Sequence, residues 1–218
     1  SRLPAANGNG WNSADVTITW SCTNSLSPIL SGTVTQTLTA EGAAQSATGM
    51  CQDQAGNTAS NTQSGINIDK TAPTGVSLVP SGTLGNNGWY TSNVTITTTG
   101  TEAVSGPLTC TGVQSLTTDT ASATFNGSCT NLAGFTSNAA PLTLKRDATN
   151  PTITFLNRTP ANGNGWNNGD VTLNWSCTDA MSGPVDGTIT QTATAEGANQ
   201  SSTATCFDNA GNSASDTQ

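Results

Sequence analysis

The chain has 218 residues, of which 8% are charged, with a formal net charge of −8, five Lys or Arg residues and no histidine. So few cations argue against a phosphate-binding surface, which needs clustered Lys and Arg, and we expect no nucleic-acid partner. The absence of histidine removes the familiar Ser-His and Cys-His arrangements, and no apolar run is long enough to cross a membrane. We therefore expect neither an enzyme nor membrane insertion of this segment.

The chain contains internal copies of one segment. Residues 6–63 repeat as residues 161–218 at a constant offset of 155 residues, which is the separation of Trp11 from Trp166. A more divergent copy lies between them at an offset of 78, where Trp89 matches Trp11. Such repetition favours several small domains over one large domain.

Within each copy, apolar residues alternate with polar ones, mostly threonine. This is the pattern of a strand with one buried and one exposed face, and no window has the spacing of an amphipathic helix. Turn sequences such as Asn-Gly-Asn-Gly, Glu-Gly-Ala and Ala-Gly-Asn separate the alternating runs, so the sequence predicts an all-β chain. The predicted strands include, in chain order, residues 15–22, 33–35, 66–68, 75–78, 152–155 and 170–177.

Two short segments that contain proline, residues 68–74 and 145–152, occupy equivalent places and separate the copies. They predict three domains, 1–70, 71–148 and 149–218, which we call the first, middle and third copies, with limited flexing at the linkers. Compared with the middle copy, the first lacks its N-terminal strand and the third its C-terminal strand, so we expect a piece of a longer polypeptide. The open edges predict neighbouring repeats, or copies of the same protein, as partners through β-strand complementation.

The six cysteines fall into one pair per copy. This fits disulfides formed in an oxidising, extracytoplasmic compartment, whereas zinc would want histidine or Cys-x-x-Cys spacing, which are both absent. One such bridge stabilises a small domain by roughly 3 to 4 kcal/mol. The middle copy has Gly100 where the others have their first cysteine, so its bridge must join a different pair of strands. The predicted pairs are Cys22 with Cys51, Cys110 with Cys129, and Cys177 with Cys206.

Four motifs carry a resemblance to a known family. They are Ile-Asp-Lys-Thr-Ala-Pro-Thr at 68–74, Trp-Ser-Cys-Thr-Asp at 175–179, Ala-Glu-Gly-Ala-Asn-Gln at 195–200 and Cys-x-Asp-x-Ala-Gly-Asn at 206–212. Together they resemble the bacterial immunoglobulin-like repeats that occur in tandem in very large surface and secreted proteins. The resemblance covers nearly the whole chain. It implies three tandem immunoglobulin-like antiparallel β-sandwich domains in an extended rod, with one disulfide per domain.

The same resemblance implies an extracellular location at the bacterial cell surface. It also implies a structural role, as a repeat segment of a large protein that forms a fibre, stalk, sheath or surface layer. The alternative is an adhesin segment that binds a glycan or Ca²⁺. An exposed aromatic or carboxylate cluster retained in a single copy would favour that alternative.

One pair of acids could hold a metal ion. Asp179 and Asp208 each lie two residues past a cysteine of the third copy, which places both carboxylates at the same end of adjacent strands. With carbonyl groups of the Ser182–Gly183 turn they could bind Ca²⁺, the only cofactor that the sequence suggests. The other explanation is that Asp208, like Asp53, makes an Asx turn into Ala-Gly-Asn. The equivalent pairs in the other copies are Asn24 with Asp53 and Glu102 with Asn131.

Five further acids occupy repeated places. Asp69 and Asp147 lie in the two linkers. They resemble the calcium-binding linkers of cadherins, although each linker supplies one acid where those supply several. Glu41, Asp119 and Glu196 occupy equivalent places before a turn and are predicted to be solvated loop acids.

Two features could involve sugars. A tryptophan follows a glycine-containing turn in each copy, and such a residue either packs the end of a sandwich or, when exposed, binds a glycan. The tryptophans are Trp11, Trp89 and Trp166. Sequons and a threonine-rich strand face also predict glycosylation, with O-linked sugars on threonine and N-linked candidates at Asn93, Asn126, Asn157, Asn174 and Asn199.

Overall fold

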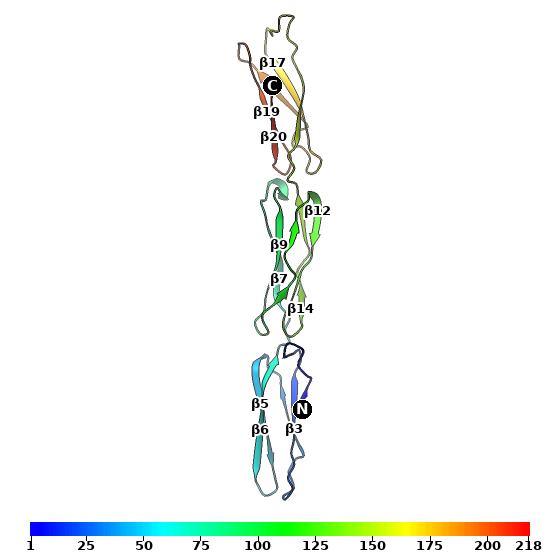
Figure 1. Ribbon diagram of the computed structural model, residues 1–218, viewed down its shortest axis with the longest axis vertical. Helices are drawn as coiled ribbons and strands as arrows, with labels where there is room; N and C mark the ends of the chain where they lie inside the picture. Colours follow the sequence, from blue (N-terminus) through cyan, green and yellow to red (C-terminus); the bar gives the residue numbers. More distant parts are fainter. The chain divides into compact units, whose positions relative to one another are not determined.

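The computed structural model describes all 218 residues and consists of β-strands joined by turns. The predicted all-β class is thereby confirmed, since the only other regular element is a 3-10 turn, η1 (Asn86–Gly88). No helix in the structure has the length and apolar character needed to cross a bilayer. The strands, several of which are labelled in Figure 1, are β1 (Arg2–Leu3), β2 (Trp11–Asn12), β3 (Val16–Ser21), β4 (Thr33–Leu38), β5 (Gly42–Gln52), β6 (Thr58–Ile68), β7 (Thr74–Ser81), β8 (Trp89–Tyr90), β9 (Val94–Thr101), β10 (Thr109–Cys110), β11 (Gln114–Leu116), β12 (Thr120–Phe125), β13 (Ser128–Thr130), β14 (Thr136–Asn138), β15 (Leu142–Arg146), β16 (Thr152–Arg158), β17 (Val171–Thr178), β18 (Thr188–Ala193), β19 (Thr203–Phe207) and β20 (Ser213–Thr217).

The chain divides into two compact units, and each unit contains one linker. Unit 1 comprises Ser1–Leu78, Thr98–Gly112 and Asn126–Ala140, and unit 2 comprises Val79–Thr97, Val113–Phe125 and Pro141–Gln218. The first copy therefore belongs to unit 1 and the third copy to unit 2, while the middle copy contributes residues to both. The boundaries of three domains, at 1–70, 71–148 and 149–218, stay a prediction.

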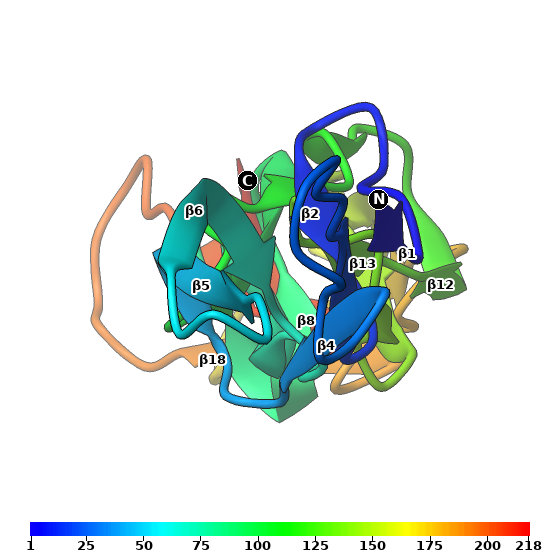
Figure 2. The ribbon, with the colours of Figure 1, turned by 90° about the horizontal axis from the view of Figure 1, so that it is seen from below.

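The first copy has two three-stranded sheets, in the orders β1-β3-β4 and β2-β6-β5. In Figure 2, β5 and β6 lie on one side of this copy and β1 and β4 on the other. Alternation along β3 turns Val16 and Ile18 inward, and the buried cluster is completed by Ala47, Ile66 and Ile68. The disulfide between Cys22, just after β3, and Cys51 on β5 ties the two sheets together.

A glycine on β5 makes room for the tryptophan that precedes the first cysteine. A Cβ atom on Gly49 would lie 2.3 Å from the ring of Trp20, which rests across the strand and donates from Nε1 to Asn61 Oδ1 at 3.1 Å. The equivalent residues of the third copy are Ala204 and Trp175, and both side chains are fully buried there. The tryptophan is therefore half-buried in the copy whose facing strand has glycine, and fully buried in the copy whose facing strand has alanine.

The third copy pairs β16, β17 and β18 in one sheet and β19 with β20 in a second. Its core contains Leu173, Trp175 and Ala204, and Phe155 meets Trp175 edge-on with ring centroids 5.6 Å apart. Cys177 on β17 and Cys206 on β19 form the disulfide, so this bridge also joins two sheets.

The middle copy has smaller sheets and a different bridge. Its sheets have the orders β11-β9-β7, β12-β15-β8 and β10-β13-β14. Cys110 and Cys129 lie directly opposite each other on the adjacent strands β10 and β13, and their disulfide joins two strands of one sheet. A Cβ atom on Gly100 would lie 3.2 Å from Cys129 Sγ, so the glycine that replaces the first cysteine leaves space beside the relocated bridge. The bridge therefore joins a different pair of strands, as predicted.

Candidate metal centre

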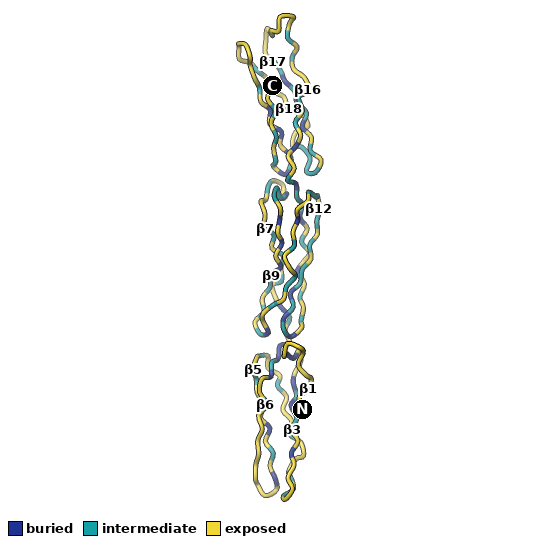
Figure 3. Tube along the Cα trace, in the orientation of Figure 1, coloured by how far each residue is buried: buried dark blue, intermediate teal, exposed yellow.

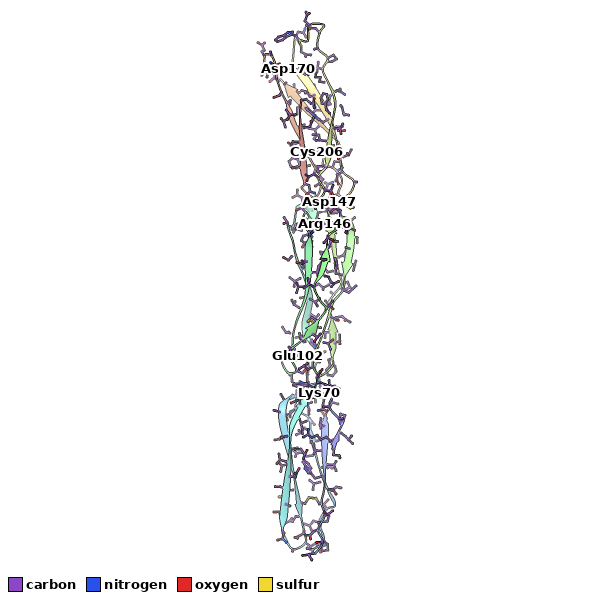
Figure 4. All side chains as sticks on the ribbon, in the orientation of Figure 1. Lys70, Glu102, Arg146, Asp147, Asp170 and Cys206 are labelled. Carbon is purple, nitrogen blue, oxygen red and sulfur yellow. A yellow bond between two sulfur atoms is a disulfide. The ribbon has the colours of Figure 1, made fainter.

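Three aspartates meet where the second linker enters the third copy, and we call them the second linker site. Asp147 follows β15, Asp179 follows β17 and Asp208 follows β19, and one oxygen of each carboxylate lies within 4.8 Å of the others. Asp147 and Asp208 have 0% of their surface exposed, while Asp179 is half-buried. Figure 4 labels Asp147 beside Arg146 at the end of β15, with Cys206 on the strand that leads to Asp208.

Neutral groups supply every hydrogen bond that these carboxylates accept. Asp208 Oδ1 accepts from the backbone N–H groups of Gly211 and Asn212 at 2.7 and 2.8 Å, and its Oδ2 accepts from Asn212 Nδ2 at 2.8 Å. Asp147 Oδ2 accepts from Ser182 N at 3.0 Å. Neither of the chain's two salt bridges involves these acids.

Asp179 contributes the most accessible oxygen of the site. Its Oδ1 accepts from the backbone N–H groups of Met181 and Gly183, at 3.0 and 2.8 Å, whereas its Oδ2 has no partner in the protein. A groove of about 420 Å³ that includes Asp179, Asp119 and Asn150 opens beside it. Buried like charges repel one another unless a counter-charge balances them, and carboxylate oxygens are the ligands that Ca²⁺ prefers. The arrangement can therefore hold a divalent cation.

The first linker has an equivalent group, which we call the first linker site: Asp69, Glu102 and Asn131. Here the amide Nδ2 of Asn131 donates to Asp69 Oδ2 at 3.0 Å, to Glu102 Oε2 at 2.9 Å and to the carbonyl oxygen of Thr71 at 2.9 Å. The Oγ of Ser105 donates a short hydrogen bond to Asp69. An amide nitrogen thus occupies the centre of this site, surrounded by three oxygen atoms.

The hydrogen bonds of the first linker site also change a pKa. Burial raises the pKa of Glu102, but hydrogen bonds from the Val104 N–H and from Asn131 Nδ2 outweigh burial, and the pKa lies below its ordinary value of 4.5. The ionised form of this carboxyl is therefore the one that the folded protein stabilises.

In the first copy, the pair equivalent to Glu102 and Asn131 is Asn24 and Asp53. Asn24 Nδ2 donates to Asp53 Oδ2 at 3.0 Å, and Asn57 donates from its backbone N–H and its Nδ2, both at 2.9 Å. The Asn57 side chain is the main cause of a lowered pKa of Asp53, and burial opposes it. Each of the first two copies therefore has one amide in the pair, and only the third copy has carboxylates at both positions.

Comparison with protein-family models finds no match to this chain, and comparison with curated protein sequences finds none either.

The structure brings together the two acids that the sequence paired and adds a third. Asp179 and Asp208 lie side by side, as the sequence predicts, and they are joined by Asp147, which the sequence relates only to the calcium-binding linkers of cadherins. The expected carbonyl ligands are placed differently, because the oxygens of Ser182 and Gly183 both accept from Asn209 Nδ2 at 3.0 Å. The Ser182 residue instead contributes its N–H to Asp147.

The Asx-turn interpretation holds as well. Asp53 Oδ1 accepts from Asn57 N, and Asp208 Oδ1 accepts from Gly211 N and Asn212 N. These bonds close the Ala-Gly-Asn turns in both copies. Because each carboxylate has two oxygens with two lone pairs each, the turn and an ion can share the same side chain.

Two of the three predicted solvated loop acids also accept hydrogen bonds from the linkers. Glu41 Oε1 accepts from Lys70 N at 2.6 Å and from Thr71 Oγ1 at 2.8 Å. Asp119 accepts from Ala148 N at 2.9 Å and forms a salt bridge with Arg146. Glu41 is exposed, as predicted, while Asp119 is half-buried, and both contact a linker because strand pairing carries a turn that is remote in sequence to the side of the linker. The sequence signal that could have indicated this role is an acid that recurs at one position of every copy, together with a threonine that recurs in both linkers.

The tryptophans divide into two environments. Trp11 and Trp89 are 8% exposed, and their strands pair in parallel with β6 and β15 respectively, which supports the packing explanation for both. Trp166 is 54% exposed and belongs to no strand. It is the one member of the three whose indole can meet a ligand.

The candidate glycosylation sites differ in accessibility. Asn174 is half-buried and donates from Nδ2 to Asn157 Oδ1 at 2.9 Å, whereas Asn157 and Asn126 are exposed. Asn93 is exposed and accepts from Arg146 Nη2 at 2.9 Å. Asn199 is exposed in a turn with a positive φ of 57°. Asn174 is therefore the least accessible of the five.

Proposed function

We propose that this chain is a structural segment of tandem immunoglobulin-like sandwiches in an extracellular bacterial protein, part of a fibre, stalk, sheath or surface layer. The observation that carries the proposal is the burial of both linker aspartates. Asp69 and Asp147 have 0% of their surface exposed, and Figure 3 shows short buried stretches between exposed ones where the chain passes from one copy to the next. A flexible tether would leave such groups to water.

Each linker aspartate bonds with the copy that follows it. Asp69 accepts from Ser105 and Asn131 of the middle copy, and Asp147 accepts from the Ser182 N–H of the third copy. The carbonyl oxygen of Asp147 also accepts from Asn212 Nδ2 at 3.1 Å. Buried, hydrogen-bonded linkers restrict rotation between successive copies, as a fibre or stalk requires.

The three disulfides support an extracellular location. Bridges of this kind persist in oxidising compartments and are rare in the cytosol. They also supply the staple that small sandwiches with small cores need. Exposed threonines on the strands, several in cross-strand hydroxyl pairs such as Thr48 with Thr62, keep a surface of low charge polar.

The structural role can be tested by measuring whether the copies tumble together. NMR relaxation of backbone ¹⁵N nuclei should give one common rotational diffusion tensor on both sides of each linker, and Asp147→Ala should release the third copy. Asp170→Ala is the matched control, because Asp170 is exposed and lies away from the linker in Figure 4. Independent tumbling of the copies in the unaltered protein would contradict a structural role.

A second candidate function, calcium binding, is favoured by one specific observation. At the position where Asn131 provides a central donor in the first linker site, the second linker site has Asp208, a third carboxylate. A Ca²⁺ ion held by Asp147, Asp179 and Asp208 would replace the missing donor and stiffen the second linker.

The matched variants for this test are Asp208→Asn and Asp186→Asn, since Asp186 is an exposed acid of the same copy. Calorimetric titration should show one Ca²⁺ site in the unaltered protein and in Asp186→Asn, and none in Asp208→Asn. Saturating calcium should raise the free energy of unfolding by about 3 kcal/mol at a hundredfold excess over Kd. An unaltered protein that binds no calcium and melts identically with a chelator would eliminate this function.

A further inference from the structure

Two strands, β4 and β18, form unprotected edges of their sheets. Each pairs with one neighbour only, β4 with β3 and β18 with β17. Their sequences are Thr-Val-Thr-Gln-Thr-Leu and Thr-Ile-Thr-Gln-Thr-Ala, and the pairing covers all six residues of each strand without a bulge. Neither strand contains a charged residue, a proline or a glycine. Such edges are open to pairing with a further strand.

The other edge strands have protection that β4 and β18 lack. β7 contains Pro80, and the register shifts at bulges in β5, β12 and β16. β19 is covered by residues 183–185, since Val185 N donates to Phe207 O at 2.9 Å, and β20 contains the charged residue Asp216. The remaining edges, β1, β2, β8, β10, β11 and β14, have two or three residues each. Short strands, prolines, bulges, charges and covering loops are the means by which proteins keep sheet edges from pairing.

Alternate backbone groups of β18 point away from its sheet. Cys177 N donates to Gly187 O at 3.0 Å, so this pair and every second pair along the two strands exchange hydrogen bonds. The next of these pairs is Trp175 with Ile189. The N–H and C=O groups that face outward therefore belong to the residues between them, Thr188, Thr190 and Thr192.

The backbone of β4 has the same arrangement. Cys22 N donates to Gly32 O at 3.0 Å, which turns the backbone groups of Thr33, Thr35 and Thr37 outward. The carbonyl oxygen of Thr33 accepts from Ser31 Oγ at 2.6 Å. The two edges thus present matching rows of backbone donors and acceptors, and an exposed threonine side chain accompanies each.

The neighbouring copies do not cause these open edges. In the middle copy, which has a linker on both sides, the corresponding strand β11 is also the edge of its sheet. A preceding or following copy therefore does not supply the strand that β4 and β18 lack. β11 has only three residues, since the chain before it pairs with β13 beside the relocated disulfide, where Thr111 N donates to Ser128 O at 2.8 Å.

We infer that β4 and β18 each pair, in antiparallel orientation, with the same strand of a second molecule of this chain. The inference rests on the proposed structural role and identifies the surface through which molecules meet side by side. Two chains that each have a formal net charge of −8 repel one another, but these strands contain no charge and can approach.

The pairing is self-complementary. With Thr190 opposite Thr190 of the second molecule, threonine meets threonine along the outer face of the joined sheets. Threonine hydroxyls already pair across adjacent strands within the chain, as Thr17 does with Thr37 at 2.9 Å. The same patch on both molecules makes the contact, so it is isologous. It is also weak, because two six-residue strands bury less area than a stable interface does.

Sedimentation of the full chain, measured from micromolar to millimolar concentration, should show reversible association. The double variant Thr35→Pro and Thr190→Pro removes an outward N–H group from each edge and no bond to β3 or β17, and β7 already contains a proline at an edge. It should associate at least roughly tenfold more weakly, because a symmetric pair of strands loses this donor from both partners. The control is Ala40→Pro with Ala195→Pro, at exposed and equivalent positions just after the same strands, and it should associate as the unaltered chain does.

A second measurement needs no variant. Amide hydrogen exchange of the unaltered chain, followed by NMR at low and at high concentration, should slow at the outward N–H groups as the concentration rises. The N–H groups of Ile189 and Gln191 already bond to β17 and should change little. The groups that should become protected are those of Thr35, Thr37, Thr188, Thr190 and Thr192.

Three results would overturn the inference. The unaltered chain could stay monomeric at millimolar concentration, exchange could slow away from the two edges, or a folded Thr35→Pro and Thr190→Pro variant could associate as well as its control. Thermal unfolding establishes whether that variant is folded, and the exchange measurement decides alone if it is not. Tumbling of the copies is measured on dilute protein within one molecule, so the proposed structural role can hold while this test fails.

Discussion

The two linker sites share a plan but balance their charges differently. In both, the linker aspartate accepts a hydrogen bond from the threonine two residues later: Asp69 from Thr71 N at 2.9 Å and Asp147 from Thr149 N at 3.1 Å. The first site then places an amide nitrogen among its oxygens, and the second places a carboxylate there. One change from nitrogen to oxygen turns a satisfied hydrogen-bond network into a group of acids that can take a cation.

A serine at equivalent positions reinforces the difference. Ser105 Oγ donates to Asp69 in the first linker site, whereas Ser182 Oγ lies 3.4 Å from Asp179 Oδ1 and leaves Asp147 to a backbone N–H. The first site thus directs its side-chain donors at the linker acid. In the second site the serine hydroxyl donates to Asp179 instead, and Asp147 accepts only from backbone N–H groups. Carboxylate oxygens of the second site therefore stay available to a ligand.

The largest expected effect comes from giving the first linker site the chemistry of the second. Asn131→Asp removes a donor shared by three oxygens and adds a carboxylate beside Asp69 and Glu102, and we expect it to lower the free energy of unfolding by about 3 kcal/mol in chelator. Calcium should restore much of this loss. Urea unfolding with calcium and with chelator measures both effects. Asn138→Asp on exposed β14 is the control, and a loss no larger than that of the control would contradict the comparison.

Removing the serine hydroxyls should have a smaller effect that differs between the sites. Ser105→Ala deprives buried Asp69 of a donor and Ala133 N of its acceptor, and we expect a cost of about 2 kcal/mol. Ser182→Ala removes only a long hydrogen bond to Asp179 and the acceptor for Ala210 N, so it should cost less. Thermal unfolding of the two variants provides the measurement. Equal losses would mean that the linker aspartate does not depend on its serine.

The smallest effect concerns pH. The folded pKa of Glu102 lies below 4.5, so its contribution to stability is fully present above about pH 4.5 and is lost as the pH falls through the folded value. Glu102→Gln should therefore be less stable than the unaltered protein at neutral pH, and the difference should shrink below pH 4.5. Unfolding free energies measured from neutral to acidic pH test this. Glu196→Gln, which changes an exposed acid, should show no such convergence.

Much of the fold could be predicted because its signals are local. Alternation of apolar residues with threonine identifies strands such as β3 and β17, since side chains along a strand point to opposite faces. The repeat of Cys22 and Cys51 as Cys177 and Cys206 indicates which cysteines pair, because equivalent residues of two copies must occupy equivalent places. Gly100, at the place of a first cysteine, indicates that the middle bridge is relocated.

The candidate site was predictable only in part. Asp179 and Asp208 could be paired because each follows a bridged cysteine at the same distance in sequence. Asp147 could not be added to them, because its position depends on how the chain leaves β15 and crosses to β16. Glu41 and Asp119 were missed for a related reason. A carboxylate in a turn looks solvated until the fold places linker N–H and hydroxyl groups opposite it.

The sequence by itself determined the copies, the all-β class and the cysteine pairs, since each follows from residue spacing along one strand or between equivalent positions. Only the tertiary structure decided which polar groups meet at the linkers. Whether Asn131 donates to Asp69, or Asp208 faces Asp147, is a contact between residues that are far apart in sequence. Their side chains meet because turns after different strands end at the same linker. Hydrogen bonds and charge repulsion act over a few ångströms, so the character of each site is determined by that meeting.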